Sequence, residues 1–350
     1  MDRPNVAQIK IANRLISISH KPLIIPEIGI NHNGSLEIAF KIVDAAKRSG
    51  AEIIKHQTHI PDDEMSLEAK KIKPANANKN IYEIISKTSL NEEQEFKLFN
   101  YVRKKKMIYL STPFSKAAVD RLVKFGVNAF KIGSGEMNNF PLINYITKFR
   151  KPMIISTGMH STSNVRTMVS FLAKKKCKFA LMHTTNLYPT PNKLVRLNSI
   201  TELKKNFPDL VIGLSDHTRT NHSSLGAVAL GACIIEKHFV DKKNRKGPDI
   251  RASINEKELK NLIKDCNIIF LQREGKKNLL KEEQVTRNFA FASVVSIKEI
   301  KKGEKLSETN IWVKRPGNGD FSANNYWKII GKQAIKNIKK NIQIRKSDIK

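Results

Sequence analysis

Two histidines give the sharpest chemical signal in the sequence. His217 and His238 occur in the contexts GLSDHT and IIEKHF, each at or just beyond the end of a short apolar run. Two imidazoles at neighbouring strand ends can bind one divalent metal and leave positions open for water and a substrate oxygen. Glu136 and Asp249 would add carboxylate contacts. Each histidine alone is better explained as a hydrogen-bonded residue near a rim, so the metal interpretation depends on the pair.

A second set of residues combines lysines with hydroxyl and amide side chains. Lys55 and Lys131 lie inside strand-like runs, where a lysine is costly to desolvate unless it meets negative charge. Lysine offers phosphate or carboxylate a compact point charge. The alternative is a structural network in which both lysines pair with Glu27 and Glu136. The candidate anion ligands are Lys55, Ser111, Thr112, Lys131, Ser134, Ser156, Asn186 and Ser215.

Glu27 follows the first apolar run and precedes a His-Asn-Gly turn. A carboxylate at a strand end can act as a base toward a bound substrate. The sequence has no GxxxxGK[ST] loop and no GxGxxG after the first strand, so a nucleotide site is not supported.

All these residues lie at the ends of apolar runs, and the runs alternate with helical patterns. Strand and helix in alternation indicate a parallel sheet with right-handed crossovers. Eight units predict a (β/α)8 barrel, a TIM barrel, with its active site at the C-terminal ends of the strands. The runs are 23–25, 53–54, 108–110, 129–130, 153–155, 179–182, 211–214 and 234–235, and the helical patterns are 35–49, 91–106, 116–125, 141–148, 164–176, 197–207, 223–230 and 256–274.

The sequence changes character in two places. Residues 58–90 form a connection too long for a plain turn, and such a loop is usually functional, as a lid or a substrate wall. After residue 276, short strand-like runs with Lys-Gly and Pro-Gly turns predict a small, mostly-β domain. We therefore expect an N-terminal extension at 1–20, the barrel at 21–276, a linker at 277–290 and the small domain at 291–350.

Composition excludes several classes of protein. Apolar residues make up 40% and charged residues 27% of the 350, as in a folded enzyme. No apolar stretch approaches membrane-spanning length, the N-terminus resembles no secretory signal, and three scattered cysteines match no metal motif, which together indicate a cytoplasmic protein. The net charge of +31 comes from short lysine runs, several of which close helices. A solvated lysine-rich surface explains this better than nucleic-acid binding.

Taken together, the strand-end motifs resemble the sialic acid (N-acetylneuraminate) synthase family. The similarity runs from about residue 20 to the C-terminus. The matching stretches are PEIGINHNGS, IIKHQT, YLSTPF, AFKIGSGE, MIISTGM, LMHTTNLYPTP, GLSDHT, GAVALGACIIEKHF, GPDI, IKKGEKL and VKRPGNGD. The resemblance implies a barrel followed by an antifreeze-like (SAF, β-clip) domain, in a domain-swapped homodimer whose small domain caps the partner's barrel.

The resemblance also implies a reaction and a set of residue roles. Phosphoenolpyruvate would condense with an N-acetylated mannosamine-type sugar, giving a nonulosonic acid and phosphate. His217 and His238 would bind a divalent metal, typically Mn²⁺, with Mg²⁺ or Co²⁺ as alternatives, and Glu27 would be the catalytic carboxylate. Phosphoenolpyruvate would contact Lys55, Thr112, Lys131, Ser134, Ser156, Asn186 and Ser215, and the sugar would contact Asn76, Tyr188, Asp249 and Arg315.

Several functions remain open within and beyond this family. The sequence motifs NHNGS and HTTNLYPTP favour N-acetylneuraminate synthase over a legionaminic or pseudaminic acid synthase, which would use a 2,4-diacetamido-6-deoxy sugar. A 3-deoxy-heptulosonate-type aldolase would not explain the small C-terminal domain. A non-catalytic carbohydrate-binding protein is disfavoured because Glu27, both histidines and both lysines are present.

Overall fold

Eight parallel strands close into a barrel in the order β10-β3-β4-β5-β6-β7-β8-β9. The predicted (β/α)8 fold is therefore confirmed. The computed structural model describes residues 6–74 and 79–350. The barrel strands are β3 (Leu23–Gly29), β4 (Ile53–Thr58), β5 (Ile108–Pro113), β6 (Phe130–Ile132), β7 (Met153–Ser156), β8 (Phe179–Thr184), β9 (Val211–Asp216) and β10 (Ile234–His238).

The strands are almost fully buried because they meet packed side chains on both faces, as parallel strands do. Alternate residues divide between two apolar clusters. Leu23, Ile25 and Ile53 join the cluster inside the barrel. Ile24 and Ile54 join the larger cluster between strands and helices. The barrel interior is thus apolar toward the N-terminal ends of the strands. The predicted site residues lie at the C-terminal ends.

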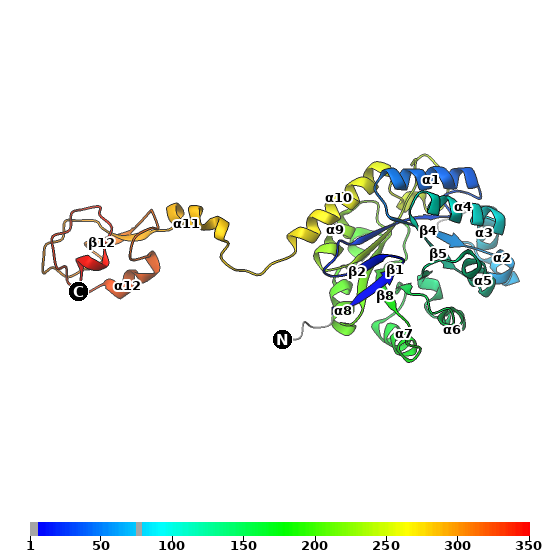
Figure 1. Cartoon of the computed structure of the whole chain (residues 1–350), viewed down its shortest axis with the longest axis horizontal. Coiled ribbons are helices and arrows are strands. Elements are labelled where there is room, and N and C mark those ends of the chain that lie inside the picture. Colours follow the sequence, from blue (N-terminus) through cyan, green and yellow to red (C-terminus); the bar gives the residue numbers. More distant parts are fainter. Residues whose placement is uncertain (1–5, 75–78) are drawn as a thin grey trace. The chain divides into compact units, whose positions relative to one another are not determined.

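Helices surround the strands, as Figure 1 shows. Capping side chains fix where several of them begin: Ser35, Asn91 and Asn255 each accept from a backbone N–H of the first turn. The predicted helices are all present within two residues of the expected bounds. They are α1 (Leu36–Arg48), α4 (Glu92–Lys104), α5 (Lys116–Phe125), α6 (Phe140–Thr147), α7 (Thr162–Lys174), α8 (Asn198–Asn206), α9 (His222–Ala229) and α10 (Glu256–Gln272).

The long connection after β4 contains structure that the sequence pattern did not indicate. It forms α2 (Pro61–Glu64), a 3-10 helix (Leu67–Lys71) and α3 (Ile81–Thr88). Helix α3 begins at Asn80, whose side chain accepts from the N–H of Glu83. Ile81, Ile84 and Ile85 have helical spacing, but two turns are shorter than the window of about 11–18 residues over which a helical period is read. The sequence pattern therefore predicts a loop here.

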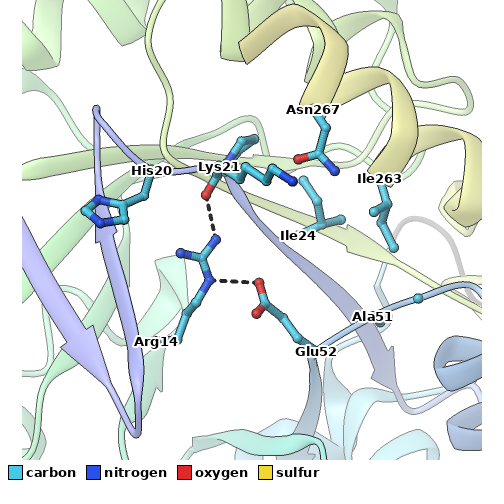
Figure 2. Close-up of a pocket in the computed structure, with 10 residues that line it drawn as sticks. Arg14, His20, Lys21, Ile24, Ala51, Glu52, Ile263 and Asn267 are labelled. Atoms are coloured by element: carbon cyan, nitrogen blue, oxygen red, sulfur yellow. Dashed lines mark hydrogen bonds and ion pairs between the residues drawn. The ribbon is translucent and has the colours of Figure 1, made fainter. Parts of the chain in front are cut away.

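The N-terminal segment is also more structured than an extension. Strands β1 (Gln8–Ile11) and β2 (Arg14–Ser17) form an antiparallel hairpin, and Ile9, Ile11 and Ile16 pack into the cluster inside the barrel. Figure 2 shows how Arg14 ties the hairpin to the barrel, by donating to Glu52 (Nε to Oε1, 2.9 Å) and to the carbonyl of Lys21. The hairpin therefore closes the N-terminal end of the barrel.

Residues Gly275–Lys350 form a second unit with its own core. Strands β11 (Ser293–Ser296) and β12 (Ile311–Lys314) pair antiparallel, and isolated bridges such as Ile300 with Ile338 add further pairing. The core contains Val294, Ile300, Leu306, Ile311, Tyr326, Ile329, Ala334, Ile338, Ile344 and Ile349. Two short helices, α11 (Gln284–Ala290) and α12 (Tyr326–Ile329), complete the unit. Across residues 6–74 and 79–350, no helix is long and apolar enough to cross a membrane.

One glycine inside the barrel wall gives a test of this packing. A Cβ added at Gly213 of β9 would lie 2.6 Å from the carbonyl oxygen of Ile234, a backbone atom that cannot move aside. We predict that Gly213→Ala lowers the free energy of unfolding by about 1–3 kcal/mol, measured by urea denaturation. Gly135→Ala is the control, because its added Cβ meets no atom within 4 Å. Equal stability of the two variants would contradict the packing described.

Candidate active site

The C-terminal ends of the strands surround a cavity of about 240 Å³, called here the inner cavity. A second cavity of about 370 Å³, the outer cavity, adjoins it and is lined partly by loops and by α3. The two share Gln57, Phe114, Glu136, Tyr188 and His238. The cavity of Figure 2, about 420 Å³, lies at the opposite end of the barrel and contains none of the predicted site residues. The candidate active site therefore comprises the inner and outer cavities.

Most of the predicted site residues come together around the inner cavity. Asp249 lines the outer cavity. Arg315 is exposed in the second unit, directly after β12, and Asn76 lies outside the described residues. The residues with a predicted substrate, metal or catalytic role that line the inner cavity are Glu27, Lys55, Thr112, Lys131, Ser134, Ser156, Asn186, Tyr188, Ser215, His217 and His238.

Ser111 was expected among the anion ligands and faces the other way. Its neighbour Thr112 lines the inner cavity, and successive residues of a strand point to opposite faces. The Ser111 hydroxyl instead lies 2.7 Å from the hydroxyl of Thr58. Because adjacent strand residues point to opposite faces, Ser111 and Thr112 cannot both line the cavity, and Ser111 is the one that points away.

Lys55 lies between two buried carboxylates on the floor of the inner cavity. Its Nζ is 2.9 Å from both Glu27 Oε1 and Glu236 Oε1, and all three side chains are almost fully buried. Burial disfavours the charged lysine, but the two carboxylates outweigh it and raise the pKa of Lys55. Burial likewise disfavours ionised Glu27, yet His238, Lys55 and Lys131 hold the pKa of Glu27 well below its usual range. Glu27 is therefore ionised at neutral pH.

Glu236 is the site residue that the sequence analysis missed as a functional group. It occupies the place in the lysine network that the alternative interpretation gave to Glu136. The Ser215 hydroxyl donates to its Oε1 at 3.0 Å, and Lys131 Nζ lies 3.8 Å from the same oxygen. Glu236 lies two residues before His238 on β10. Because alternate residues of a strand point to the same face, Glu236 points into the inner cavity as His238 does.

Lys131 is buried with fewer compensating charges than Lys55. Its ammonium donates to Ser156 Oγ at 2.6 Å and to the carbonyl of Ile132 at 2.9 Å. Burial, reinforced by the neighbouring charge of Lys55, lowers the pKa of Lys131 to about 8. Such a lysine is still mostly cationic at pH 7 and would gain from an anionic ligand.

The two histidines face each other across the rim of the inner cavity, with ring centroids 5.4 Å apart. His217 Nδ1 donates to the carbonyl of Thr185 at 2.9 Å, which leaves the lone pair of Nε2 free. Burial and the neighbouring His238 lower the pKa of His217 to about 3, so this ring is neutral. Neutral imidazoles oriented by a carbonyl are the form that binds metal ions.

His238 has its own pair of carboxylate neighbours. Its Nε2 lies 3.6 Å from Glu27 Oε2, and its Nδ1 lies 3.8 Å from Asp249 Oδ2 without a hydrogen-bond partner. In the part of the chain that the structure describes, no three His, Cys, Asp or Glu side chains gather as a metal site. The site offers two imidazole donors, so a cation bound between them would take its other ligands from water and substrate.

Several buried polar atoms around the cavity have no partner within the protein. They are Thr112 Oγ1, Asn186 Oδ1, Glu236 Oε2 and His238 Nδ1. A buried polar atom without a hydrogen bond costs free energy, and a polar ligand would supply the missing bonds. The inner cavity is thus prepared for a small polar molecule.

The outer cavity joins an apolar wall to a few carboxylates. Ile81, Ile84 and Ile85 of α3 line one side. Glu136 lies at the boundary between the two cavities, and burial, together with the charge of Glu64, raises its pKa to about 7. His59 stacks on Phe114 with centroids 4.2 Å apart and bonds Glu64 through Nδ1. This cavity suits a ligand that carries both methyl and hydrogen-bonding groups.

Comparisons with known proteins agree with the fold and identify the family. The model of the NeuB family matches residues 42–278, and that of the SAF domain matches residues 291–350. N,N'-diacetyllegionaminic acid synthase of Campylobacter jejuni is 40% identical over 93% of this chain and 99% of its own. Pseudaminic acid synthase of the same species is 34% identical over 94% and 96%. N-acetylneuraminic acid (sialic acid) synthetase of Leptospira borgpetersenii superposes with a TM-score of 0.74 at 28% identity, over 80% of this chain and 95% of that one.

The lowered pKa of Lys131 predicts how anion binding depends on pH. The amine loses its charge as the pH rises through about 8, whereas Lys55, with its raised pKa, stays charged. Phosphoenolpyruvate is almost fully ionised above about pH 7, because the second pKa of a phosphate is about 6, so its own charge is constant where Lys131 titrates. We expect its affinity, measured by calorimetry from pH 6.5 to 9.5, to fall above about pH 8.

Lys131→Arg is the matched variant for this experiment. A guanidinium keeps its charge throughout the range, so the remaining affinity of the variant should not fall above pH 8. Affinity of the unmodified protein that stays constant to pH 9.5 would show that Lys131 is not the anion ligand.

Proposed function

The chain belongs to the NeuB family, whose members are phosphoenolpyruvate-dependent synthases of nonulosonic acids, and we propose that it condenses phosphoenolpyruvate with a 2,4-diacetamido-6-deoxy sugar. The enzyme is a transferase that forms a carbon–carbon bond, and its co-substrate is an amino sugar. The product of the proposed reaction is a legionaminic-type acid, released together with phosphate.

Phosphoenolpyruvate occupies the inner cavity in this proposal. Lys55 and Lys131 balance its negative charges, and the unpartnered hydroxyl of Thr112, with the other hydroxyls on the wall, can donate to its phosphate and carboxylate oxygens. Because these donors are already fixed in a closed barrel, little reorganisation is needed as charge moves during the reaction. Enclosing both substrates in adjoining cavities also removes much of the entropic barrier to bond formation.

The acceptor sugar occupies the outer cavity in its open-chain form, with its aldehyde at the boundary near His238. The enol carbon of phosphoenolpyruvate attacks the aldehyde carbon, and positive charge develops on the adjacent carbon. Water adds there, and the tetrahedral product loses phosphate to leave the keto acid. Glu27 is ionised and accepts the proton of the incoming water, while Glu136, with a pKa of about 7, can donate a proton to the aldehyde oxygen.

We also propose that His217 and His238 hold a divalent cation, with Mn²⁺ preferred over Mg²⁺ or Co²⁺. A cation held there would polarise the aldehyde carbonyl toward attack. The free lone pair of His217 Nε2 and the unpartnered Nδ1 of His238 support this assignment. Tyr188 stacks on His217 at 4.1 Å and so restricts the orientation of that ring.

The apolar wall of α3 is the observation that carries the choice of acceptor. A 2,4-diacetamido-6-deoxy sugar carries three methyl groups, two from its acetamido groups and one at C6, and Ile81, Ile84 and Ile85 offer contacts for them. The 40% identity with a legionaminic acid synthase supports the same choice. N-acetylmannosamine is the second candidate, because Glu64, Glu136 and Asp249 beside the wall can accept hydrogen bonds from additional hydroxyls.

Two further parts of the proposal involve the rest of the chain. Asn76 and Arg315 are proposed to contact the sugar, and the second unit is proposed to cap the barrel of a partner in a domain-swapped homodimer. Support for this part comes from the SAF-domain match and from the VKRPG motif around Arg315. A cytoplasmic location likewise stays a prediction.

Phosphate release tests the choice of acceptor. The protein is incubated with phosphoenolpyruvate, Mn²⁺ and either 2,4-diacetamido-2,4,6-trideoxymannose or N-acetylmannosamine. We expect kcat/KM to be at least about tenfold higher for the diacetamido sugar, since a single apolar group in a fitted pocket is worth about that factor. Higher activity with N-acetylmannosamine would assign a neuraminate synthase, and no release with any acceptor would contradict the enzymatic proposal.

Ile84→Thr provides a matched test of the apolar wall. We expect it to reduce the preference for the diacetamido sugar without changing the KM for phosphoenolpyruvate, because Ile84 lines only the outer cavity. Leu67→Thr is the control, as Leu67 is 73% exposed and lines neither cavity.

A chelator and a histidine variant test the metal proposal. Treatment with EDTA should abolish phosphate release, and added Mn²⁺ should restore it. His238→Ala should lose metal-dependent turnover by a factor of about 100 or more while its circular dichroism spectrum stays unchanged. His222→Ala is the control, because His222 is exposed, bonds the nearby Thr220 hydroxyl and lines neither cavity. Full activity after exhaustive chelation would rule out a metal role for the two histidines.

A further inference from the structure

A buried polar chain lies outside the two cavities and takes no part in the reaction proposed above. It begins at Glu95 of α4, a carboxylate with no exposed surface. Thr58, Tyr109 and Arg121 all donate to this carboxylate, the last two at 3.0 Å. Burial opposes its ionisation, but these bonds and that of His56 lower the pKa of Glu95. Because this buried carboxylate accepts hydrogen bonds from several donors, its side chain is held rigidly in one position.

Two histidines connect Glu95 to the loop after β3. His56 Nδ1 lies 3.3 Å from Glu95 Oε1, and His56 Nε2 lies 3.2 Å from His32 Nε2. The N–H of Gly34 donates to His32 Nδ1 at 3.2 Å. Burial, with the neighbouring His56 and His59, lowers the pKa of His32 to about 3, so its ring is neutral and carries one proton.

The hydrogen bonds decide where the ring protons are. Because His32 Nδ1 accepts from Gly34, the single ring proton of His32 is on Nε2, which donates to His56 Nε2. His56 must then carry its own proton on Nδ1, which lies 3.0 Å from the Tyr109 hydroxyl and 3.3 Å from Glu95 Oε1. The Tyr109 hydroxyl donates to Glu95 and so can accept this proton. Each ring in the chain therefore has one defined tautomer, fixed at the far end by the Glu95 carboxylate.

The same loop reaches the connection between β10 and α10. Asn31 donates to the carbonyl of Phe239, the residue after His238, and to the hydroxyl of Ser253. That hydroxyl donates in turn to the carbonyl of Asp249 at 2.8 Å. Asn33 adds a bond to the carbonyl of Lys246 at 2.6 Å. The loop therefore holds the segment that carries Asp249 into the outer cavity.

We infer that Glu95, His56 and His32 are positioning residues that orient Asp249, through Asn31 and Ser253, for the acceptor sugar. This inference rests on the proposed function for its kinetic test. None of the three side chains lines either cavity, so they act only through the loop. Lys131 on β6 and Ser156 on β7, which are proposed to bind phosphoenolpyruvate, bond to each other and not to Glu95, His56 or His32. Lys55, the other cation proposed for that substrate, is next to His56 on β4, but its ammonium bonds Glu27 and Glu236.

His32→Asn separates this role from a general effect on stability. Asparagine keeps an acceptor near the Gly34 N–H but is too short to contact His56, so it disconnects the loop from Glu95. We expect the KM for the acceptor sugar to rise by about tenfold, with the KM for phosphoenolpyruvate changed by less than about twofold. Tyr101→Phe is the control: it removes the bond from α4 to Asp44, and should lower the melting temperature without changing either KM.

Two kinetic outcomes would overturn the inference. If His32→Asn destabilises the protein but changes neither KM, the chain of residues is only structural. If both KM values rise equally, the effect is a general distortion rather than a positioning of Asp249. Glu95→Gln, at the far end, should shift the acceptor KM in the same direction, and an unchanged value with a folded protein would also count against the inference.

Nitrogen-15 NMR of the histidine side chains tests the same chain without turnover. We expect the ring proton of His32 on Nε2 and that of His56 on Nδ1. A proton on His32 Nδ1 would overturn the inference. Absence of phosphate release by the unmodified protein with any sugar would contradict the proposed function instead, and the tautomers would still report on the chain.

Discussion

The pairing of buried charges at the barrel axis is the constraint on which the rest of the site depends. Lys55 lies 2.9 Å from both Glu27 and Glu236, and Lys131 adds a second cation 3.8 Å from Glu236. Neither sign of charge would be tolerated alone in this interior, because an unpaired buried ion costs several kcal/mol. Together the groups nearly balance, so the barrel folds with its cations in place before any anionic substrate arrives.

The barrel can accommodate such a charged cluster because its N-terminal half is apolar and its C-terminal half is polar. Toward the N-terminal ends of the strands, apolar side chains fill the interior, and the β1–β2 hairpin closes it. This half supplies stability through burial of apolar surface. The polar half is held in register by the same strands, so the positions of Glu27 and Lys55 follow directly from the pairing of β3 with β4.

The sequence predicted what depends on short-range pattern. Apolar runs with polar ends located the strands, and consecutive runs placed His217 beside His238. What it missed depends on three-dimensional context. Glu236 lies two residues before a predicted ligand, yet only the closed barrel shows that its side chain meets Lys55. Helix α3 was missed because two turns are too short to distinguish from a loop, even with isoleucines at helical spacing. Ser111 was misplaced because a strand alternates its faces.

The division between inner and outer cavity explains why the sugar was harder to predict than the reaction. The inner cavity is built by residues at strand ends, which a barrel fixes within narrow limits. The outer cavity takes much of its wall from α3 and from the connection after β10, and loops can change while the strands beneath them stay the same. Relatives named for legionaminic, pseudaminic and sialic acids can therefore share one barrel. A motif at a strand end identifies the shared chemistry, whereas the proposed choice of acceptor depends on side chains such as Ile84, which belong to no strand-end motif.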